Sequence, residues 1–347
     1  MRILVTGGNG FVGRHLVSAL YARGDAVRVL ALPDENTSWL EELGVEVHRG
    51  DVRDPETLTR PMDGVDAVVH LAAMIHVWRS MEDYSAVNVA GTENVCRAAL
   101  AAGVARVVHM SSSSVYGMDL GRIVDETFPL APFRGDPYPV TKAAADRAVQ
   151  RMIADDGLPA VVLRPDQIFG PGDDLIFGRM ADRLRAGRTV IVGSGKNALP
   201  WVYVTDVVQG LRLALDHGRA VGQAYNITSD KPLTQQQLLH AIARAIGAPA
   251  PRLRAPYRVL YAAGYVAERA TALSRSGRRP PITRFGVAFL GTDNRYAIGK
   301  AKRDLGYSPA VSVAGGVELT AAWYRAREGG RPVPAPMLGP VAKEAHT

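Results

Sequence analysis

The chain has 347 residues, of which 47% are hydrophobic and 22% charged, the balance of a globular protein with room for one large domain and a smaller one. Its formal net charge is +7, but the excess is concentrated between residues 249 and 281, so we do not expect nucleic-acid binding. A single cysteine, Cys96, excludes an internal disulfide, favours a reducing compartment and falls in an apparent helix, where we expect a core residue.

Neither a membrane span nor an export signal is predicted. No run of about 18 apolar residues occurs, so no spanning helix is expected. Met1 leads almost at once into an apolar strand pattern without a polar cleavage region, which does not resemble a signal peptide. We therefore predict a cytoplasmic protein.

Short apolar runs alternate with longer amphipathic runs through the first half of the chain. This pattern predicts strands at 3–5, 27–30, 45–48, 67–70, 106–110 and 159–163, and helices at about 11–22, 84–102 and 138–154. Strands that alternate with helices indicate an α/β fold with a Rossmann-type, doubly wound parallel sheet. We assign this domain to residues 1–165.

The alternation of strand and helix patterns becomes less regular after residue 165, where proline and glycine are more frequent. We predict a smaller C-terminal substrate-binding region at 166–328, some of whose elements return to the first domain, such as a strand at 201–204. Residues 329–347 lack periodicity and are predicted to form a disordered tail.

A glycine-rich turn lies between the first predicted strand and the first predicted helix. Gly7 permits the tight turn, Gly10 lets the backbone approach a pyrophosphate, and Gly13 allows close helix–strand packing. The helix N-terminus adds free N–H groups and partial positive charge. The turn predicts a dinucleotide site that includes Gly7, Asn9, Gly10, Phe11, Val12 and Gly13.

The end of the second strand bears on the choice between NAD and NADP. Ala31 stands where an acid would hold the adenine ribose, and Leu32 stands where an arginine would hold a 2′-phosphate. Asp34 and Glu35 follow and disfavour an extra phosphate, so the cofactor is NAD or NADP with a lean to NAD. Asp51, after the third strand, is a candidate acceptor for the adenine amino group, or alternatively a loop-capping aspartate.

A tyrosine, a lysine and a serine cluster suggest proton chemistry. Tyr138 and Lys142 are four residues apart, hence one turn apart on one helix face, and a nearby ammonium lowers the pKa of a phenol. Serines 111–114 follow the strand at 106–110, at the sheet edge where open α/β sheets bind ligands. His70, His76 and His109 lie near strand ends, but no metal-ligand spacing joins them, so we predict no metal site.

Together these motifs resemble the extended short-chain dehydrogenase/reductase family, also called the NAD-dependent epimerase/dehydratase superfamily. The resemblance implies a catalytic Ser–Tyr–Lys set in which Ser112 is the first choice and Ser113 the second, with Tyr138 moving the proton and Lys142 binding the nicotinamide ribose. Arg164 is expected to pair with a loop acid, or alternatively to contact a ligand. The cofactor contacts predicted on this basis are Asp51, Val52, Leu71, Ala72, Ala73, Asn88, Ser111, Tyr138, Lys142, Pro165 and Ile168.

Departures from the family pattern limit the set of reactions that we expect of this chain. Related dehydratases carry an Asp-Glu pair where this chain has Ser113 and Ser114, so water elimination is disfavoured. Related epimerases carry an arginine near residue 199 for the nucleotide diphosphate, where this chain reads Ala198-Leu-Pro-Trp201. Arg179, Arg183 or Lys196 remain as substitutes, so this absence alone does not decide the substrate.

The region from 256 to 309 resembles the 3β-hydroxysteroid dehydrogenase-like branch, through the segments 280–284, 291–296 and 298–309. The apolar, arginine-flanked segment 257–273 suits a lid over a hydrophobic substrate, a face against a membrane or hydrophobic carrier, or an ordinary packed helix. We therefore predict an NAD(P)-dependent oxidoreductase that interconverts a secondary alcohol and a ketone on a largely apolar small molecule. The alternatives are a UDP-hexose 4-epimerase-like enzyme and a non-catalytic redox-sensing binder. The resemblance further implies a homodimer.

Overall fold

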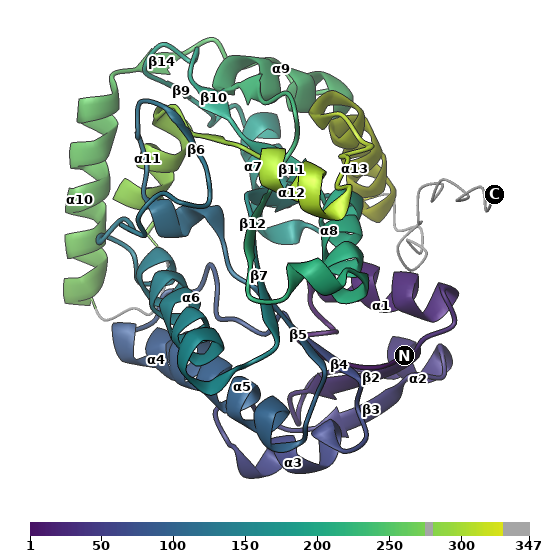
Figure 1. Cartoon of the computed structure of the whole chain (residues 1–347). Helices are drawn as coiled ribbons and strands as arrows, with labels where there is room; N and C mark the ends of the chain where they lie inside the picture. The colour runs from purple at the N-terminus through teal and green to yellow at the C-terminus, as the bar shows by residue number, and fades with distance from the viewer. Residues whose placement is uncertain (275–279, 329–347) are drawn as a thin grey trace.

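The computed structural model describes residues 1–274 and 280–328 (Figure 1). The predicted tail at 329–347 lies outside the described residues, as do Arg275, Arg278 and Arg279 of the basic segment. Within the described residues, seven parallel strands form one sheet in the order β12-β7-β5-β4-β1-β2-β3. The strands are β1 (Arg2–Thr6), β2 (Ala26–Ala31), β3 (Glu46–Arg49), β4 (Ala67–His70), β5 (Arg106–Met110), β7 (Ala160–Pro165) and β12 (Ala224–Ile227).

This strand order confirms the predicted Rossmann-type, doubly wound α/β fold. The chain runs outward from β1 through β2 to β3, then returns to place β4 on the other side of β1. In sheets of this kind ligands bind at the carboxyl ends of the strands, beside such a reversal of the strand order, which here falls between β1 and β4. β12 comes from the second half of the chain and pairs with β7.

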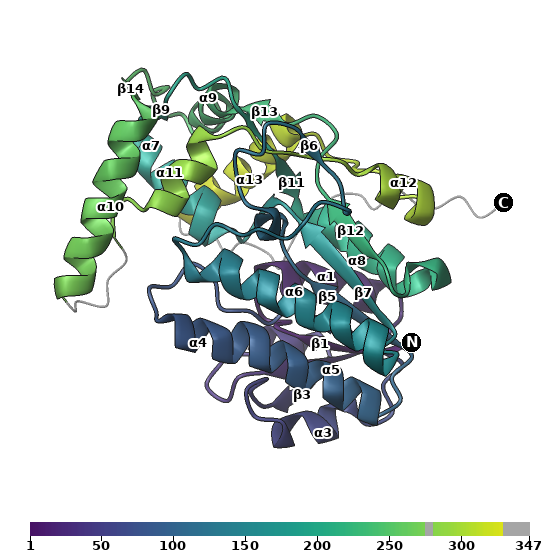
Figure 2. The same ribbon diagram turned by 60° about the vertical axis from the view of Figure 1, so that its left-hand side comes forward.

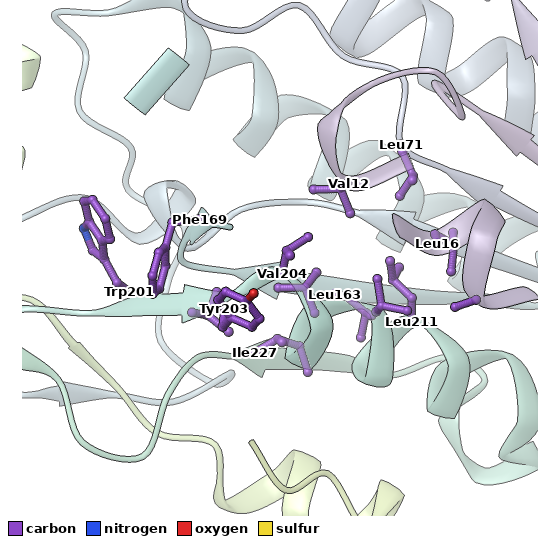
Figure 3. Close-up of a cluster of buried hydrophobic side chains, with 14 of the residues drawn as sticks. Val12, Leu16, Leu71, Leu163, Phe169, Trp201, Tyr203, Val204, Leu211 and Ile227 are labelled. Atoms are coloured by element: carbon purple, nitrogen blue, oxygen red, sulfur yellow. The ribbon is translucent and has the colours of Figure 1, made fainter. Parts of the chain in front are cut away.

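Alternating side chains of the central strands build two cores. Ile3 and Val5 of β1 enter one core and Leu4 enters the other, as the period of two in a strand requires. Figure 3 shows the first core, in which Leu16 and Leu211 meet Leu163 of β7. The helices that cover this face include α1 (Phe11–Ala22), α2 (Ser38–Glu42), α8 (Val204–Asp216) and α12 (Gly299–Leu305).

Helices that lie side by side in Figure 2 cover the opposite face. They are α3 (Glu56–Met62), α4 (Met81–Ser85), α5 (Gly91–Ala101) and α6 (Pro137–Asp156). Cys96 is fully buried in this second core, and burial raises the pKa of its thiol to about 12. The expectation of a core cysteine is therefore confirmed.

The helix expected at about 84–102 differs from the structure in its start and its continuity. It begins at Met81 because Ser80 and Asp83 form a reciprocal capping box. A π-helical turn, Ala86–Ala90, then separates α4 from α5. The turn carries Asn88, which is 1% exposed, so the irregularity coincides with an inward-facing polar side chain.

Most of the second half forms a region above the carboxyl end of the sheet (Figures 1 and 2). Its helices are α7 (Arg179–Arg185), α9 (Gln235–Ala245), α10 (Tyr257–Ser274), α11 (Arg284–Gly291) and α13 (Val313–Glu328). Four short strand pairs connect the loops: β6 (Ile123–Val124) with β15 (Arg295–Tyr296), β8 (Gln167–Phe169) with β11 (Trp201–Tyr203), β9 (Ile191–Val192) with β14 (Arg254–Ala255), and β10 (Ala198–Leu199) with β13 (Leu233–Thr234).

Helix α10 stands at the edge of the molecule, at the left in Figure 1, and packs against α11. Gly264 allows the close approach, since a Cβ there would lie 2.9 Å from the Arg284 backbone nitrogen. Glu268 adds an ion pair, accepting from Arg284 Nε at 2.6 Å. The outer face of α10 exposes Val259, Val266 and other apolar side chains. The side of α10 that faces α11 is therefore fixed by close packing and an ion pair, whereas its opposite side is exposed to solvent.

Candidate functional site

The glycine turn between β1 and α1 has the packing that a dinucleotide site needs. Gly7 has a φ of 70°, and a Cβ there would lie 2.8 Å from the Ala72 backbone nitrogen. A Cβ on Gly13 would lie 2.2 Å from the Gly7 carbonyl oxygen. Gly10 is the N-cap residue of α1, and no described side chain caps this end. The free N–H groups, with no acid in the first turn, suit a pyrophosphate.

Neighbouring side chains shape this turn. Asn9 Oδ1 accepts from Trp39 Nε1 at 2.6 Å and from Arg14 at 2.9 Å, so Asn9 ties the turn to the segment after β2. Phe11 is half-buried and packs beside Gly172, while Val12 is buried in the first core. The predicted residues of this turn therefore lie together at the carboxyl end of β1.

Asp51, the expected acceptor for the adenine amino group, follows β3 at the carboxyl edge of the sheet. Its carboxylate accepts from the Arg53 side chain at 2.6 Å, and this bond holds the pKa of Asp51 below its usual range. Val52 is buried against Gly91 of α5. Ala31 is buried at the end of β2, whereas Leu32 is exposed. A negative charge therefore stands at this end, partly balanced by Arg53.

The loop after β4 lies next to the glycine turn. Leu71 is buried, and Ala72 and Ala73 are half-buried next to the glycine turn. Asn88 Oδ1 accepts from Met74 N at 2.7 Å, and its Nδ2 donates to Thr141 Oγ1 at 3.0 Å. These bonds occupy the Asn88 amide, so in this structure it links the loop to α6.

Ser112, which follows β5, and Tyr138 of α6 lie next to each other. Asp136 caps α6 by accepting from Tyr138 N at 2.9 Å, which places Tyr138 in the first helical turn. Burial raises the pKa of Tyr138 to about 12, and the neighbouring Ser112 side chain acts in the opposite direction. Ser113 faces elsewhere, towards Asp166 and Tyr296. Of the two serines considered, the structure brings Ser112 to the tyrosine.

Lys142 does not act on Tyr138 as expected. Its Nζ donates to the Met110 carbonyl oxygen at 2.6 Å, and it is not among the groups that shift the pKa of Tyr138. Burial lowers the pKa of Lys142 itself to about 8. The expected lowering of the Tyr138 pKa is therefore wrong for this structure, because the ammonium is bound to β5 and burial dominates at the phenol.

Ser111 and Arg164 form a buried polar cluster beneath these residues. Ser111 Oγ donates to Asp146 Oδ2 at 2.6 Å, and Arg164 Nε donates to the same oxygen at 2.9 Å. The Ser111 hydroxyl thus bonds inside the protein. Arg164 pairs with a helix acid of α6, where a loop acid was expected. Pro165 is buried at the end of β7, and Ile168 is half-buried in β8.

Two cavities lie near this pair: Tyr138 lines the larger, and Ser113 and Ser114, the neighbours of Ser112, line the smaller. The larger has a volume of about 150 Å³ and includes Trp78, Tyr84, Tyr138 and Phe285 in its lining, with His76 stacked on the Tyr138 ring. The smaller, of about 20 Å³, is lined partly by Ser113, Ser114 and Asp166. Sequence reasoning missed Asp166, although its place after β7, beside the end of β5, could have indicated it.

The sequence also led us to expect no metal site and no membrane-spanning helix. Among the described residues, no group of three or more His, Cys, Asp or Glu side chains could hold a metal ion. His70 and His109 are buried and stack at 5.5 Å, which makes them packing residues. No helix in the described part of the chain is long and apolar enough to cross a membrane.

The fold and this site define a dinucleotide-dependent enzyme. The turn at Gly7 and the loop after β4 lie at the reversal of the strand order, and the Ser112–Tyr138 contact lies beside the end of the neighbouring strand β5. The chain belongs to the NAD dependent epimerase/dehydratase family, whose model matches residues 3–228. It is accordingly an NAD(P)-dependent enzyme of the extended short-chain dehydrogenase/reductase type.

Similar proteins span nearly the whole chain. A 2-alkyl-3-oxoalkanoate reductase of Stenotrophomonas maltophilia is 36% identical over 91% of this chain and 97% of its own length. A 3-beta-hydroxysteroid dehydrogenase of Mycolicibacterium neoaurum is 33% identical over 89% of this chain and 87% of its own. The solved structure of DesIV, a dTDP-glucose 4,6-dehydratase of Streptomyces venezuelae with NAD and TYD bound, has a TM-score of 0.76 and 30% identity, over 96% of this chain and 99% of its own.

Proposed function

We propose that the protein interconverts a secondary alcohol and a ketone on a largely apolar small molecule. The supporting observation is the pairing of the Ser112 hydroxyl with the Tyr138 phenol beside a cavity whose lining includes Trp78 and Phe285. A hydroxyl and a phenol can bind one carbonyl oxygen, and aromatic walls suit an apolar body.

In reduction, the Ser112 hydroxyl orients the ketone oxygen and Tyr138 gives that oxygen its proton. The pKa of Tyr138, about 12, keeps the phenol protonated at neutral pH, which suits a proton donor. When bound, the nicotinamide supplies the hydride that the carbonyl carbon receives. Lys142, whose Nζ is held by the Met110 carbonyl oxygen, would bind the nicotinamide ribose. The alcohol product carries the hydride on carbon and the proton on oxygen.

The substrate is proposed on two grounds. The two relatives described above are named for reactions on an oxoalkanoate and on a hydroxysteroid, both largely apolar molecules. The segment where related epimerases carry a diphosphate-binding arginine is apolar here, and Ala198, Leu199 and Trp201 are buried. Of the substitute cations, Arg183 donates to the Pro281 carbonyl. Arg183 is therefore engaged within the protein, which leaves Arg179 and Lys196 as the cations that a nucleotide diphosphate could use.

We propose NAD as the preferred cofactor over NADP. The Asp51 carboxylate is charged. Arg53 already forms an ion pair with it and is therefore not available for a 2′-phosphate. Ala31 and Leu32 add no cation for a 2′-phosphate. The direct cofactor contacts proposed are the glycine turn, Asp51, the loop 71–73 and the backbone at 111, with Asn88 as a positioning residue.

Cofactor turnover tests the proposal against epimerisation. The protein is incubated with NADH and medium-chain ketones, and separately with NAD and UDP-glucose, while the absorbance of the reduced nicotinamide is followed. We expect NADH consumption with a ketone, and a loss of at least about 100-fold in Tyr138→Phe with NADH binding retained. Epimerisation of UDP-glucose without net absorbance change would replace our proposal by the epimerase alternative.

Other expectations remain predictions. They are the division at residue 165, a homodimer, a cytoplasmic location, and a contact of the outer face of α10 with a membrane or hydrophobic carrier. The exposed apolar side chains of α10 are compatible with the last.

A further inference from the structure

The smaller cavity is connected to Ser112 through one hydrogen bond. Ser114 Oγ donates to Ser112 Oγ at 2.9 Å, and both Ser114 and Ser113 line the cavity. A volume of about 20 Å³ holds one water molecule or one oxygen-sized group of a ligand. The cavity is therefore a compartment for a single polar group beside the proposed reacting oxygen.

Asp166 provides an unpartnered polar atom on the wall of this cavity. The residue is 8% exposed, and its Oδ1 accepts from Gln167 N at 2.6 Å. Its Oδ2 is buried and has no hydrogen-bond partner among the described residues. Burial raises the pKa of Asp166 to about 8, against the effects of the Gln167 N–H and the Ser113 hydroxyl. A carboxyl in the acid form has one O–H to donate.

The other polar side chains that line this cavity already have partners. Asn294 Oδ1 accepts from Asp119 N at 3.1 Å, and its Nδ2 donates to Thr292 Oγ1 at 3.1 Å. The Tyr296 ring stacks on Tyr116 with centroids 5.8 Å apart. The Tyr296 hydroxyl interacts with Ser113. Among the described residues that line this cavity, Asp166 Oδ2 is the buried side-chain atom without a hydrogen-bond partner.

One helix reaches both cavities. Phe285 lines the larger cavity and Phe289 the smaller, and both lie on α11, four residues and hence one turn apart. A single substrate beneath α11 can therefore extend from Tyr138 to Asp166. Its apolar body would contact the phenylalanines and its oxygens would face the serines.

We propose that the Asp166 carboxyl donates a hydrogen bond from Oδ2 to a second oxygen of the substrate, a carbonyl or carboxyl oxygen next to the reacting ketone. The proposal deepens the proposed function and rests on it for the position of the ketone at Ser112 and Tyr138. It assigns Asp166 as a specificity residue for 3-oxo acids or esters over simple ketones.

A binding experiment that needs no turnover tests the proposal. Full-length protein loaded with NAD⁺, which cannot reduce a ketone, is titrated calorimetrically with methyl 3-oxodecanoate and with 3-decanone, which lacks the ester. We expect the wild type to bind the ester about 10-fold more tightly, the size of one hydrogen bond in a buried site. Asp166→Leu should abolish this ratio, because leucine cannot donate.

Asp166→Asn is the conservative variant. Its amide N–H can replace the carboxyl O–H, so we expect the ratio to be retained within about 3-fold. Asp155→Asn, on an exposed residue of α6, serves as the matched control and should change nothing. Thermal melts verify folding, and Asp166→Ala replaces the leucine variant if the latter does not fold.

The outcomes separate this proposal from the proposed function. An unchanged ratio in Asp166→Leu, or no ratio in the wild type, overturns the proposal and leaves the cavity to a buried water. A ratio lost equally in Asp166→Asn overturns the donor role. If the binding pattern holds but NADH-loaded wild type reduces neither ketone, the proposed reaction fails while the subsite stands. Binding of neither ketone overturns both.

Discussion

Arg164 of β7 donates to both carboxylate oxygens of Asp146 on α6, each at 2.9 Å, in a pair that is almost completely buried. Ser111, at the end of β5, donates to the same carboxylate at 2.6 Å. The pair therefore joins two central strands to the helix that carries Tyr138 and Lys142. It holds the proposed catalytic helix against the sheet.

Removing one partner of this pair should be severe. In Arg164→Met, Asp146 keeps a buried charge without its cation, which we expect to cost about 3–5 kcal/mol of unfolding free energy. Urea denaturation measures the loss. The double variant Arg164→Met/Asp146→Leu should lose less than the single one, because no charge is left buried. Arg97→Ala, which breaks the exposed pair with Glu93, should cost only about 0.3–0.5 kcal/mol.

Gly13→Ala should destroy the dinucleotide site. The added Cβ would meet the Gly7 carbonyl oxygen at 2.2 Å, so the turn or α1 must move. We expect NADH affinity, measured by fluorescence titration, to fall by at least about 10-fold, a loss of about 1.4 kcal/mol. Gly299→Ala is the control, since a Cβ there meets nothing within 4 Å. Equal affinity in both variants would contradict the assigned site.

Buried histidines should make the fold sensitive to acid. Burial lowers the pKa of His70 to about 3 and that of His109 well below its usual value. The unfolded chain, with histidine near 6.5, then binds more protons than the native state below that pH. Stability is therefore full above pH 6.5 and declines as the pH falls towards 3, as urea denaturation across pH should reveal.

His109→Leu isolates one of these contributions. Neither ring nitrogen of His109 has a hydrogen-bond partner among the described residues, although the side chain is fully buried. Leucine removes the unsatisfied nitrogens, so we expect it to be about 1–3 kcal/mol more stable and to show a shallower acid slope. A destabilised variant with the wild-type slope would show that the imidazole has a partner in solution.

The proposed reduction should weaken in alkali. The pKa of Lys142 is about 8, so its positive charge is lost above that pH, while Tyr138 remains protonated until about 12. We expect kcat/KM for a ketone to fall as the pH rises through about 8. Lys142→Arg, which stays charged, should show lower activity without this limb. A limb that persists in the arginine variant would assign it to another group.

Local sequence patterns predicted the glycine turn and six of the seven strands of the sheet, but not β12; the returning strand expected at 201–204 pairs with β8 outside that sheet. Helix α1 matches its predicted bounds, because its apolar periodicity and the glycines before it are both local signals. The π-helical turn at Ala86–Ala90 was not predictable, because Asn88 is drawn inward by Met74 and Thr141, partners 14 and 53 residues away. The partner of Arg164 was misplaced for the same reason.

The sequence by itself determined the fold class, the dinucleotide turn and the spacing of Tyr138 and Lys142, since each depends on periodicity or on glycine at fixed positions. Only the tertiary structure decided what the polar groups do. It placed Ser112 at Tyr138, Ser113 near Asp166, and Lys142 on the Met110 carbonyl. Proton affinities and hydrogen-bond partners depend on burial and on residues distant in the chain, and the folded packing sets both.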